Sequence, residues 1–297
     1  MADPVLVTRD LLAGWPLPEP GSSKHARGTV LLVGGSSSVP GAMQLAGEAA
    51  LRAGGGKLQV VTTESVAAQM AVSLPEALVA QAAEAASGDI AADAADRIVE
   101  LADAAKTVLL GPGMTSPDAA DALLSTIVAR LAHQAVVVDA LGSACLTSDL
   151  SRLHHLDSSA VLTLNPTEAA ITLGHDEEEV ADDPLAAAVL LARETRAAVL
   201  LGGSTKYVAE PTGQAWVVDR GGPGLGVSGS GDVQAGIVTG LLARGAEPAQ
   251  AAVWGAWLHG RSGEVLADRV GPVGFLAREL PDTVPGLLVE AGGPETG

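Results

Sequence analysis

Buried strands alternate with helices along most of this sequence, and that alternation constrains the fold more than any other feature. Runs made almost entirely of aliphatic and β-branched residues lie at residues 29–33, 58–62, 107–110, 135–138, 161–164 and 197–201. Such runs are typical of parallel strands covered on both faces. Ala-rich stretches with helical character separate them, at residues 42–53, 90–103, 117–131 and 185–195. The pattern predicts an α/β fold with a mostly parallel central sheet and helices on both faces.

The domain organisation predicted from this pattern is simple. The 297 residues contain no evident linker or internal repeat, so we expect a single domain over residues 1–297. Within it, we expect an irregular entry over residues 1–23 and a flexible tail over residues 290–297. A hairpin over residues 206–218 should add an antiparallel edge. The last predicted helices cover residues 233–243 and 248–268.

Composition excludes several functional classes. A formal net charge of −18 disfavours nonspecific nucleic-acid binding, which requires a basic surface. No apolar run approaches the ~18–20 residues of a membrane span, and the first residues do not resemble a secretory signal. The one cysteine, Cys145, lies in an apolar stretch and is expected in the core. We therefore expect a cytoplasmic protein without nucleic-acid or membrane partners.

Glycine or a short polar residue follows each of several predicted strands. These strand ends are Gly34-Gly35, Gly111-Pro112-Gly113, Asp139, Asn165 and Gly202-Gly203. Parallel strands present their carboxyl ends at one rim of a sheet, where ligands bind in open α/β folds. The pattern therefore predicts a binding site at this rim. Taken alone, the Gly34–Ser38 segment is equally typical of a plain turn.

The stretch Gly221–Gly240, GGPGLGVSGSGDVQAGIVTG, predicts a flexible loop that enters a buried helix. The first turn of such a helix has unpaired N–H groups and a partial positive charge, which suit a phosphate. Asp232 is the one group here able to accept a proton or hold a metal. A Gly-rich turn in which Asp232 merely caps the helix fits the local spacing equally well.

The segment Asn165-Pro166-Thr167-Glu168 also has two interpretations. Asn at the N-cap and Glu three residues later form a capping box. In addition, Asn165 and Glu168 at a strand end can organise a hydrated Mg²⁺ beside phosphates. Elsewhere the sequence lacks GxxxxGK[ST], GxSxG and HExxH, so a P-loop enzyme, a hydrolase of the nucleophile-elbow type and a zincin are disfavoured.

A family resemblance extends from about Lys24 to about Phe275. The segments KHARGTVLLVGGSSSVPGAMQLAGEAALRAGGGKLQVVT, LLGPGM, VVVDAL, LTLNPTEAA, LLGGSTKYV and GVSGSGDVQAGIVTGLLARG occur in this order. Together they resemble the ADP-dependent NAD(P)H-hydrate dehydratases of the ribokinase-like superfamily. The resemblance implies dehydration of NADHX and NADPHX to NADH and NADPH. It implies ADP or ATP as the phosphoryl donor, Mg²⁺, and a homo-oligomer, for which a tetramer is our expectation.

The resemblance also implies roles for individual residues. Asp232 matches the base that accepts the substrate's hydroxyl proton. Ala42, Gly113 and Asn165 match positions that face the hydrated nicotinamide nucleotide, and Glu168 is an indirect candidate for holding the metal. The nucleotide-binding positions match Gly202, Gly203, Ser204, Thr205, Lys206, Gly229, Ser230 and Gly231.

Three positions depart from the family pattern. The family usually has Lys where Gly202 stands, His where Asn165 stands, and a second Asp where Leu141 stands. Two other functions are therefore considered. One is a ribokinase-superfamily kinase for a vitamin precursor or a sugar, and the other is a non-catalytic nucleotide-binding relative.

Overall fold

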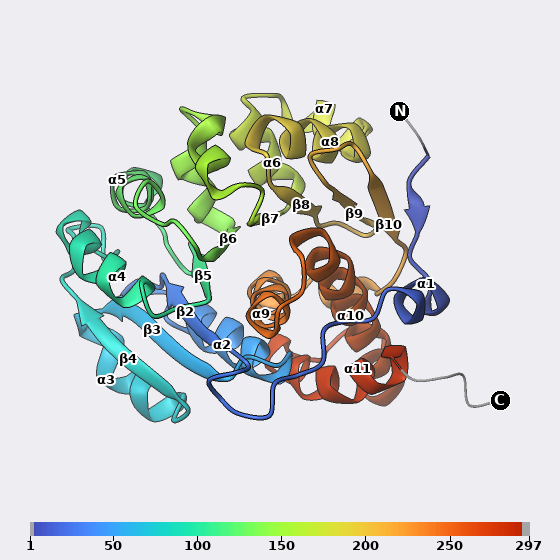
Figure 1. The fold of residues 1–297 in the computed structure, drawn as a ribbon, viewed down its shortest axis with the longest axis horizontal. Coiled ribbons are helices and arrows are strands. Elements are labelled where there is room, and N and C mark those ends of the chain that lie inside the picture. The colour runs from blue at the N-terminus through green and yellow to red at the C-terminus, as the bar shows by residue number, and fades with distance from the viewer. Residues whose placement is uncertain (1–2, 293–297) are drawn as a thin grey trace.

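A ten-stranded sheet runs through the molecule in the order β1-β10-β9-β8-β7-β6-β5-β2-β3-β4 (Figure 1). The computed structural model describes residues 3–292. All neighbouring strands pair in parallel except β9, which is antiparallel to both β8 and β10. The strands are β1 Val5–Leu6, β2 Thr29–Val33, β3 Lys57–Thr63, β4 Ala77–Ala82, β5 Thr107–Leu110, β6 Ala135–Asp139, β7 Ala160–Leu164, β8 Ala198–Leu201, β9 Lys206–Ala209 and β10 Ala215–Val218. The predicted α/β fold with a mostly parallel sheet is confirmed.

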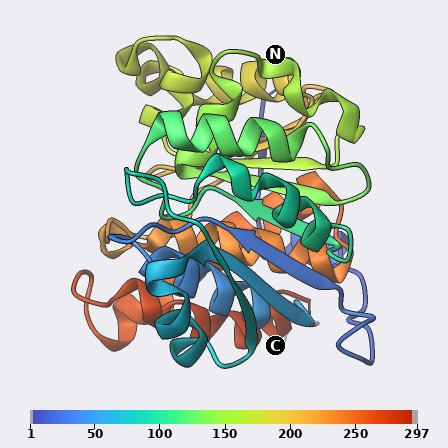
Figure 2. The same ribbon diagram turned by 90° about the vertical axis from the view of Figure 1, so that its left-hand side faces the viewer.

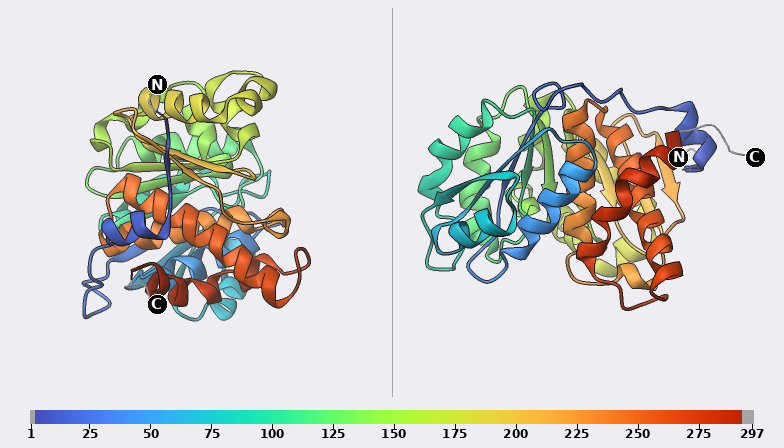
Figure 3. Two further views of the ribbon diagram at one scale, coloured as in Figure 1. Left: turned by 90° about the vertical axis from the view of Figure 1, so that its right-hand side faces the viewer. Right: turned by 90° about the horizontal axis from the view of Figure 1, so that it is seen from below.

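Helices cover both faces of the sheet. One face carries α1 Arg9–Gly14, α2 Gly41–Arg52, α3 Glu64–Ser73, α9 Ser230–Arg244, α10 Pro248–Arg269 and α11 Val284–Gly292. The other carries α4 Ala95–Ala102, α5 Pro117–Val128, α6 Pro166–Leu173, α7 Glu177–Asp182 and α8 Pro184–Thr195. Figure 2 shows α4 and α5 side by side on this second face, and Figure 3 shows α11 running beside α10 on the first.

Successive side chains of the central strands pack alternately into two hydrophobic cores, one on each face of the sheet. This explains why the sequences of these strands are almost continuously apolar. In β2, Val30 and Leu32 pack under the first helical layer, whereas Leu31 and Val33 pack under the second, and all four are fully buried. Because side chains alternate between the faces of a strand, burial on both faces removes the need for polar residues. Cys145, Trp254 and Trp257 are buried as well. Within residues 3–292, no helix has the length and hydropathy to cross a membrane.

The ends of the chain differ from the sequence-based prediction. Residues 1–23 were expected to be irregular, but they include β1 and helix α1. The two residues of β1 pair with Trp216 and Val217 of β10, so a distant strand stabilises a segment too short to be recognised locally. Consequently, β10 does not form the edge of the sheet. Of the predicted tail, residues 290–292 belong to α11, and residues 293–297 lie outside the described residues.

Residues 64–82, for which the sequence indicated no element, form α3 and the edge strand β4. β4 is rich in Ala and only partly buried, so it lacks the aliphatic run that marks the inner strands. The segment predicted as one helix over residues 90–103 is a short 3₁₀ turn, Ala92–Ala94, followed by α4. These differences leave the central strands and their connections as predicted.

Helix α9 lies directly against α2, almost backbone to backbone. A Cβ atom at Gly236 would collide with the carbonyl oxygen of Ala46, and one at Gly240 would collide with that of Ala50. Only glycine allows this approach. The contact fixes the position of α9, whose N-terminus lies at the carboxyl ends of the parallel strands.

Candidate active site

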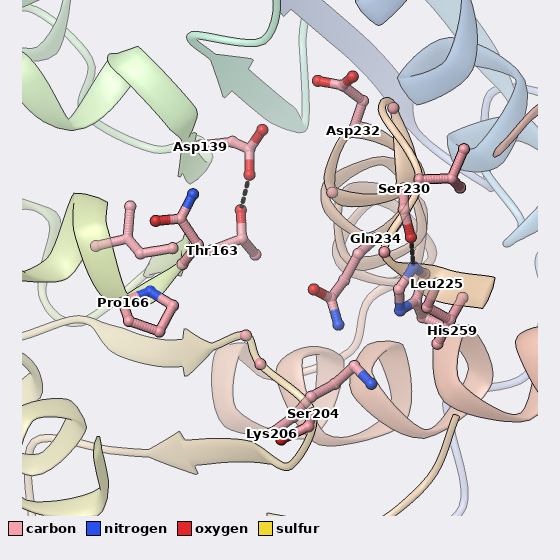
Figure 4. Close-up of a pocket in the computed structure, with 18 of the residues that line it drawn as sticks. Asp139, Thr163, Pro166, Ser204, Lys206, Leu225, Ser230, Asp232, Gln234 and His259 are labelled. Atoms are coloured by element: carbon pink, nitrogen blue, oxygen red, sulfur yellow. Dashed lines mark hydrogen bonds between the residues drawn. The ribbon is translucent and has the colours of Figure 1, made fainter. Parts of the chain in front are cut away.

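A cavity of about 900 Å³ lies between the carboxyl ends of β6, β7 and β8 and the N-terminus of α9 (Figure 4). A cavity therefore lies at the predicted rim of the sheet. Its lining combines three of the predicted strand ends with the Gly-rich stretch. The lining residues are Asp139, Ala140, Thr163, Leu164, Asn165, Pro166, Glu168, Gly202, Gly203, Ser204, Lys206, Arg220, Gly222, Pro223, Leu225, Gly226, Val227, Gly229, Ser230, Gly231, Asp232, Gln234 and His259.

The N-terminus of α9 forms one wall of the cavity. Gly229 is the N-cap residue, with φ +91°, a left-handed conformation that favours glycine. No backbone hydrogen bond engages the amide nitrogens of Gly231 and Asp232 in the described part of the chain. A Cβ atom at Gly231 would have no neighbour within 4 Å, so the approach to these amides is open. Free amides at the positive end of a helix make this wall suitable for a phosphate.

Asp232, in the first turn of α9, points into the cavity (Figure 4). Desolvation, reinforced by the negative charge of Glu168, raises its pKa from 3.8 to about 6. A carboxylate with a pKa of about 6 is ionised at neutral pH and is a stronger base than an exposed one. These are the properties required of a general base.

A second carboxyl group, that of Asp139, faces the same cavity from the end of β6. Its side chain is 5% exposed and accepts a hydrogen bond of 2.7 Å from the Thr163 hydroxyl on the neighbouring strand β7. Burial raises the pKa of Asp139 well above 3.8, and the charge of Asp232 raises it further. Burial and the charge of Asp232 therefore both disfavour ionisation of Asp139.

The structure contains the capping box predicted at the start of α6. Asn165 Oδ1 accepts a hydrogen bond of 2.9 Å from the Glu168 amide, and Glu168 Oε2 accepts one of 2.9 Å from the Asn165 amide. Burial raises the pKa of Glu168, while its hydrogen bonds with Asn165 oppose that shift. Both residues also line the cavity, so the structural interpretation does not exclude a role in binding.

The opposite end of the cavity contains nitrogen donors. Lys206, at the start of β9, is 3% exposed, and its Nζ donates a hydrogen bond of 3.1 Å to the carbonyl oxygen of Arg220. The side-chain nitrogen of Gln234 is buried, and no described residue forms a hydrogen bond with it. Burial lowers the pKa of Lys206 from 10.5 to about 8.

A buried pair links the helices α9 and α10 beside these donors. Ser230 Oγ and His259 Nε2 are 2.9 Å apart, and both side chains are at most 5% exposed. Burial, together with the nearby charge of Lys206, lowers the pKa of His259 to about 3, so the imidazole is neutral. Its Nδ1 has no hydrogen-bond partner among residues 3–292. This His–Ser contact anchors the first residue of α9.

Most of the predicted site residues meet at this one cavity, but three lie outside its lining. Ala42 and Gly113 are buried next to each other, since a Cβ atom at Gly113 would lie 2.9 Å from Cβ of Ala42. They belong to α2 and to the loop after β5, farther along the same rim. Thr205 immediately precedes β9 and does not line the cavity.

Several lining residues were not selected from the sequence as site residues: Asp139, Thr163, Arg220, Gln234 and His259. The position of Asp139 directly after an apolar strand was the available signal. Gln234 and His259 lie on otherwise apolar, fully buried helical stretches. A polar residue in such a stretch is a signal, but an ordinary core hydrogen bond produces the same pattern.

Comparison with known proteins first defines the class. A ribokinase-like superfamily protein from Enterococcus faecalis superposes with a TM-score of 0.82 at 22% identity, covering 98% of this chain and 97% of that one. An ADP/ATP-dependent NAD(P)H-hydrate dehydratase from Bacillus subtilis, co-crystallised with ATP and Mg²⁺, has a TM-score of 0.80 at 26% identity and covers 98% and 100%. The predicted ribokinase-like fold is therefore confirmed.

The family follows from the sequence comparisons. A family sequence model described as NAD(P)H-hydrate dehydratase matches residues 30–286. The ADP-dependent (S)-NAD(P)H-hydrate dehydratase of Xanthomonas campestris is 45% identical over 284 residues, which cover 95% of each chain. The chain belongs to the NAD(P)H-hydrate dehydratase family, as the resemblance in the sequence implied.

Proposed function

We propose that this protein uses ADP or ATP to dehydrate NADHX and NADPHX, restoring NADH and NADPH. The observation that carries the proposal is the position of Asp232. Its carboxylate, with a pKa of about 6, projects beside the free amides of α9 into a cavity of about 900 Å³. Base and phosphate site are thus adjacent, as phosphoryl transfer to a hydroxyl group requires.

In the proposed reaction, Asp232 accepts the proton of the substrate hydroxyl. The hydroxyl oxygen then forms a bond to the terminal phosphorus of the nucleotide, and the phosphoanhydride bond breaks, so that ADP leaves as AMP or ATP as ADP. Cleavage of the carbon–oxygen bond releases inorganic phosphate, and loss of a proton from the adjacent carbon completes the double bond. The free amides of Gly231 and Asp232 stabilise the charge of the transferring phosphoryl group.

We assign the other predicted residues by their places around this centre. Gly202, Gly203, Ser204 and Lys206 line the cavity on the side of β8 and β9, where we place the nucleotide, with Thr205 supporting that loop. Gly229, Ser230 and Gly231 form the phosphate wall. Asn165 faces the substrate from the start of α6. Ala42 and Gly113 are proposed to contact the far end of the nicotinamide nucleotide.

Mg²⁺ fits this site as an ion held mainly by phosphate oxygens and water. Within residues 3–292, no group of three or more His, Cys, Asp or Glu side chains forms a preassembled metal site. Mg²⁺ bound to nucleotides commonly uses one or two carboxylates in addition to the phosphates. Glu168, close enough to Asp232 to raise its pKa, is the carboxylate we propose to orient the hydrated ion. The ion would neutralise phosphate charge.

The test is an absorbance assay for NADH with purified protein, NADHX, Mg²⁺ and either ADP or ATP. We expect NADH to form only when a nucleotide is present, and the nucleotide that works identifies the phosphoryl donor. A stable phosphorylated product without NADH would contradict the proposal in favour of a kinase. Nucleotide binding without any turnover would contradict it in favour of a non-catalytic relative. The cytoplasmic location and the homo-oligomer, with the tetramer as our expectation, stay predictions from the sequence.

A further inference from the structure

The hydroxyl group of Ser230 lies where the proposed phosphate site begins. Ser230 is the first residue of α9 and directly precedes Gly231 and Asp232, whose amides are free in the described part of the chain. Its own amide already donates a hydrogen bond of 3.1 Å to the carbonyl oxygen of Val227. Ser230 also lines the cavity, so the hydroxyl is the group that it can offer to a phosphate.

That hydroxyl group is shared with His259 on helix α10. Ser230 Oγ and His259 Nε2 lie 2.9 Å apart, as Figure 4 shows. A hydroxyl group has one hydrogen to donate, and a neutral imidazole has one N–H. If the ring accepts the hydrogen of Ser230, none is left for a ligand, whereas a ring that donates leaves it free. The tautomer of His259 therefore decides what Ser230 can offer to the cavity.

The surroundings of the ring favour the tautomer that carries its hydrogen on Nε2. Burial and the nearby charge of Lys206 lower the pKa of His259 to about 3, so the ring has a single N–H. Its Nδ1 is buried and finds no hydrogen-bond partner within residues 3–292. Buried N–H groups almost always have an acceptor, whereas acceptors without a donor are less rare. The hydrogen is therefore better placed on Nε2, where Ser230 Oγ accepts it.

A phosphate at the start of α9 is a suitable acceptor for the hydrogen that remains on Ser230. With His259 donating to Oγ, this hydrogen is free to point to a phosphate oxygen beside the amides of Gly231 and Asp232. The oxygens of an ionised phosphate accept hydrogen bonds, so they select the same direction. Each hydrogen bond in such a chain polarises and strengthens the next. Every donor from the ring to the phosphate then has an acceptor.

We infer that His259 is a positioning residue for the transferring phosphate: it donates from Nε2 to Ser230 and so directs the Ser230 hydroxyl group to that phosphate. This inference rests on the proposed function, because the phosphate is the terminal phosphate of the ADP or ATP used there. His259 acts through Ser230, and its contact with α9 therefore does more than hold two helices together. The first turn of α9 then presents a directed hydroxyl donor in addition to its free amides.

The first test uses the wild-type protein and does not depend on the folding of any variant in the binding site. Ring ¹⁵N NMR distinguishes a protonated from an unprotonated imidazole nitrogen, and comparison with His259→Gln assigns the signals among the six histidines. We expect the Nε2–H tautomer of His259 at about pH 7, in the free protein and in its ADP complex. The Nδ1–H tautomer in either state would overturn the inference.

The second test compares the binding of ADP, which carries the transferring phosphate, with that of AMP, which lacks it, by isothermal titration calorimetry. Ser230→Ala should weaken ADP binding about 10- to 100-fold, the loss of a charge-assisted hydrogen bond, and AMP binding less than about 3-fold. His259→Leu should weaken ADP binding about 3- to 10-fold, because the hydroxyl group remains but is no longer directed. His259→Gln, which keeps an N–H donor, should stay within about 3-fold of the wild type. Equal losses for ADP and AMP, or a Gln variant as weak as the Leu variant, would contradict the role.

A double variant and a matched control separate this role from simple helix packing. In the Ser230→Ala background, His259→Leu should change ADP affinity by less than about 2-fold, and a loss as large as in the wild type would refute action through Ser230. The control is Ser262→Ala, which removes another buried contact of α10, a hydrogen bond of 2.6 Å from Thr283 outside the cavity lining. It should lower the thermal midpoint of unfolding and leave ADP affinity unchanged. Weaker ADP binding by this control would overturn the inference. None of these measurements requires turnover, so they succeed or fail separately from the dehydratase assay.

Discussion

Replacement of Asp232 by Asn should make the protein more stable while abolishing its activity. The pKa of Asp232 is raised from 3.8 to about 6, chiefly by desolvation, so ionisation of this group opposes folding above about pH 6. A shift of about 2 units corresponds to at most about 3 kcal/mol. The loss of a negative charge in the first turn of α9 subtracts up to about 1 kcal/mol. We therefore expect a net gain of about 2 kcal/mol in the free energy of unfolding at about pH 8.

The stabilisation expected from Asp232→Asn depends on pH, because it comes from removing a group whose ionisation opposes folding. In the folded state Asp232 holds its proton up to a higher pH than in the unfolded state, so the cost of ionisation is absent below about pH 4 and complete above about pH 6. Urea denaturation of the wild type and Asp232→Asn at several pH values measures the difference. Glu76→Gln, which removes an exposed carboxylate, is the matched control and should change stability by less than about 0.5 kcal/mol.

The turnover rate of Asp232→Asn tests the role of this carboxylate as the base. Without the carboxylate, kcat for NADH formation should fall by about 10²- to 10⁴-fold. A variant that is stabilised and inactive supports both parts of the reasoning. An active variant would refute the role of Asp232 as base. A variant less stable than the wild type at pH 8 would refute the cost assigned to its ionisation.

Three further predictions follow from the same site. In the wild type, kcat/KM should fall about tenfold per pH unit below pH 6, as Asp232 becomes protonated, and a profile that is flat down to about pH 5 would be inconsistent with its raised pKa. Gly231→Ala should leave the thermal midpoint of unfolding nearly unchanged, because a Cβ atom there would have no neighbour within 4 Å, but it should weaken ADP binding by blocking the free amides. The matched variant Gly236→Ala should lower the thermal midpoint, because its Cβ atom would collide with Ala46. Reversed effects of the two variants would argue against this placement of the phosphate. Asn165→Ala should reduce the free energy of unfolding by about 1 kcal/mol through loss of the capping box, measured by urea denaturation; no change would mean that α6 does not depend on this cap.

The central strands could be predicted because burial on both faces leaves an unmistakable apolar run. Val30 to Val33 illustrate this, since each is fully buried and no polar residue interrupts the run. Segments held by distant partners could not be predicted. The two residues of β1 belong to a short apolar run, Val5 to Val7, and only their pairing with the distant strand β10 defines them as a strand.

The residues of the candidate site also fall into two groups, those that local sequence predicts and those that depend on distant parts of the chain. Asp232 and Gly231 were predicted because a Gly-rich turn, an acid and a helix start are adjacent in sequence. Asp139 and Asp232 line one cavity because of the order of the strands and the position of α9, and local sequence spacing contains neither. The contact between His259 and Ser230 joins residues 29 positions apart on two helices, so local sequence spacing does not indicate it.

The glycine contact between α9 and α2 has a consequence for motion. With no flexible side chains between the two backbones at Gly236 and Gly240, the amides at the start of α9 cannot shift unless α2 moves with them. Any rearrangement that encloses a ligand therefore belongs to the segment 220–229, which includes Gly221 at φ +111° and Gly229 at φ +91°. Hydrogen exchange should accordingly be slow throughout the middle of α9 with or without nucleotide, while exchange in the segment 220–229 should respond to its binding.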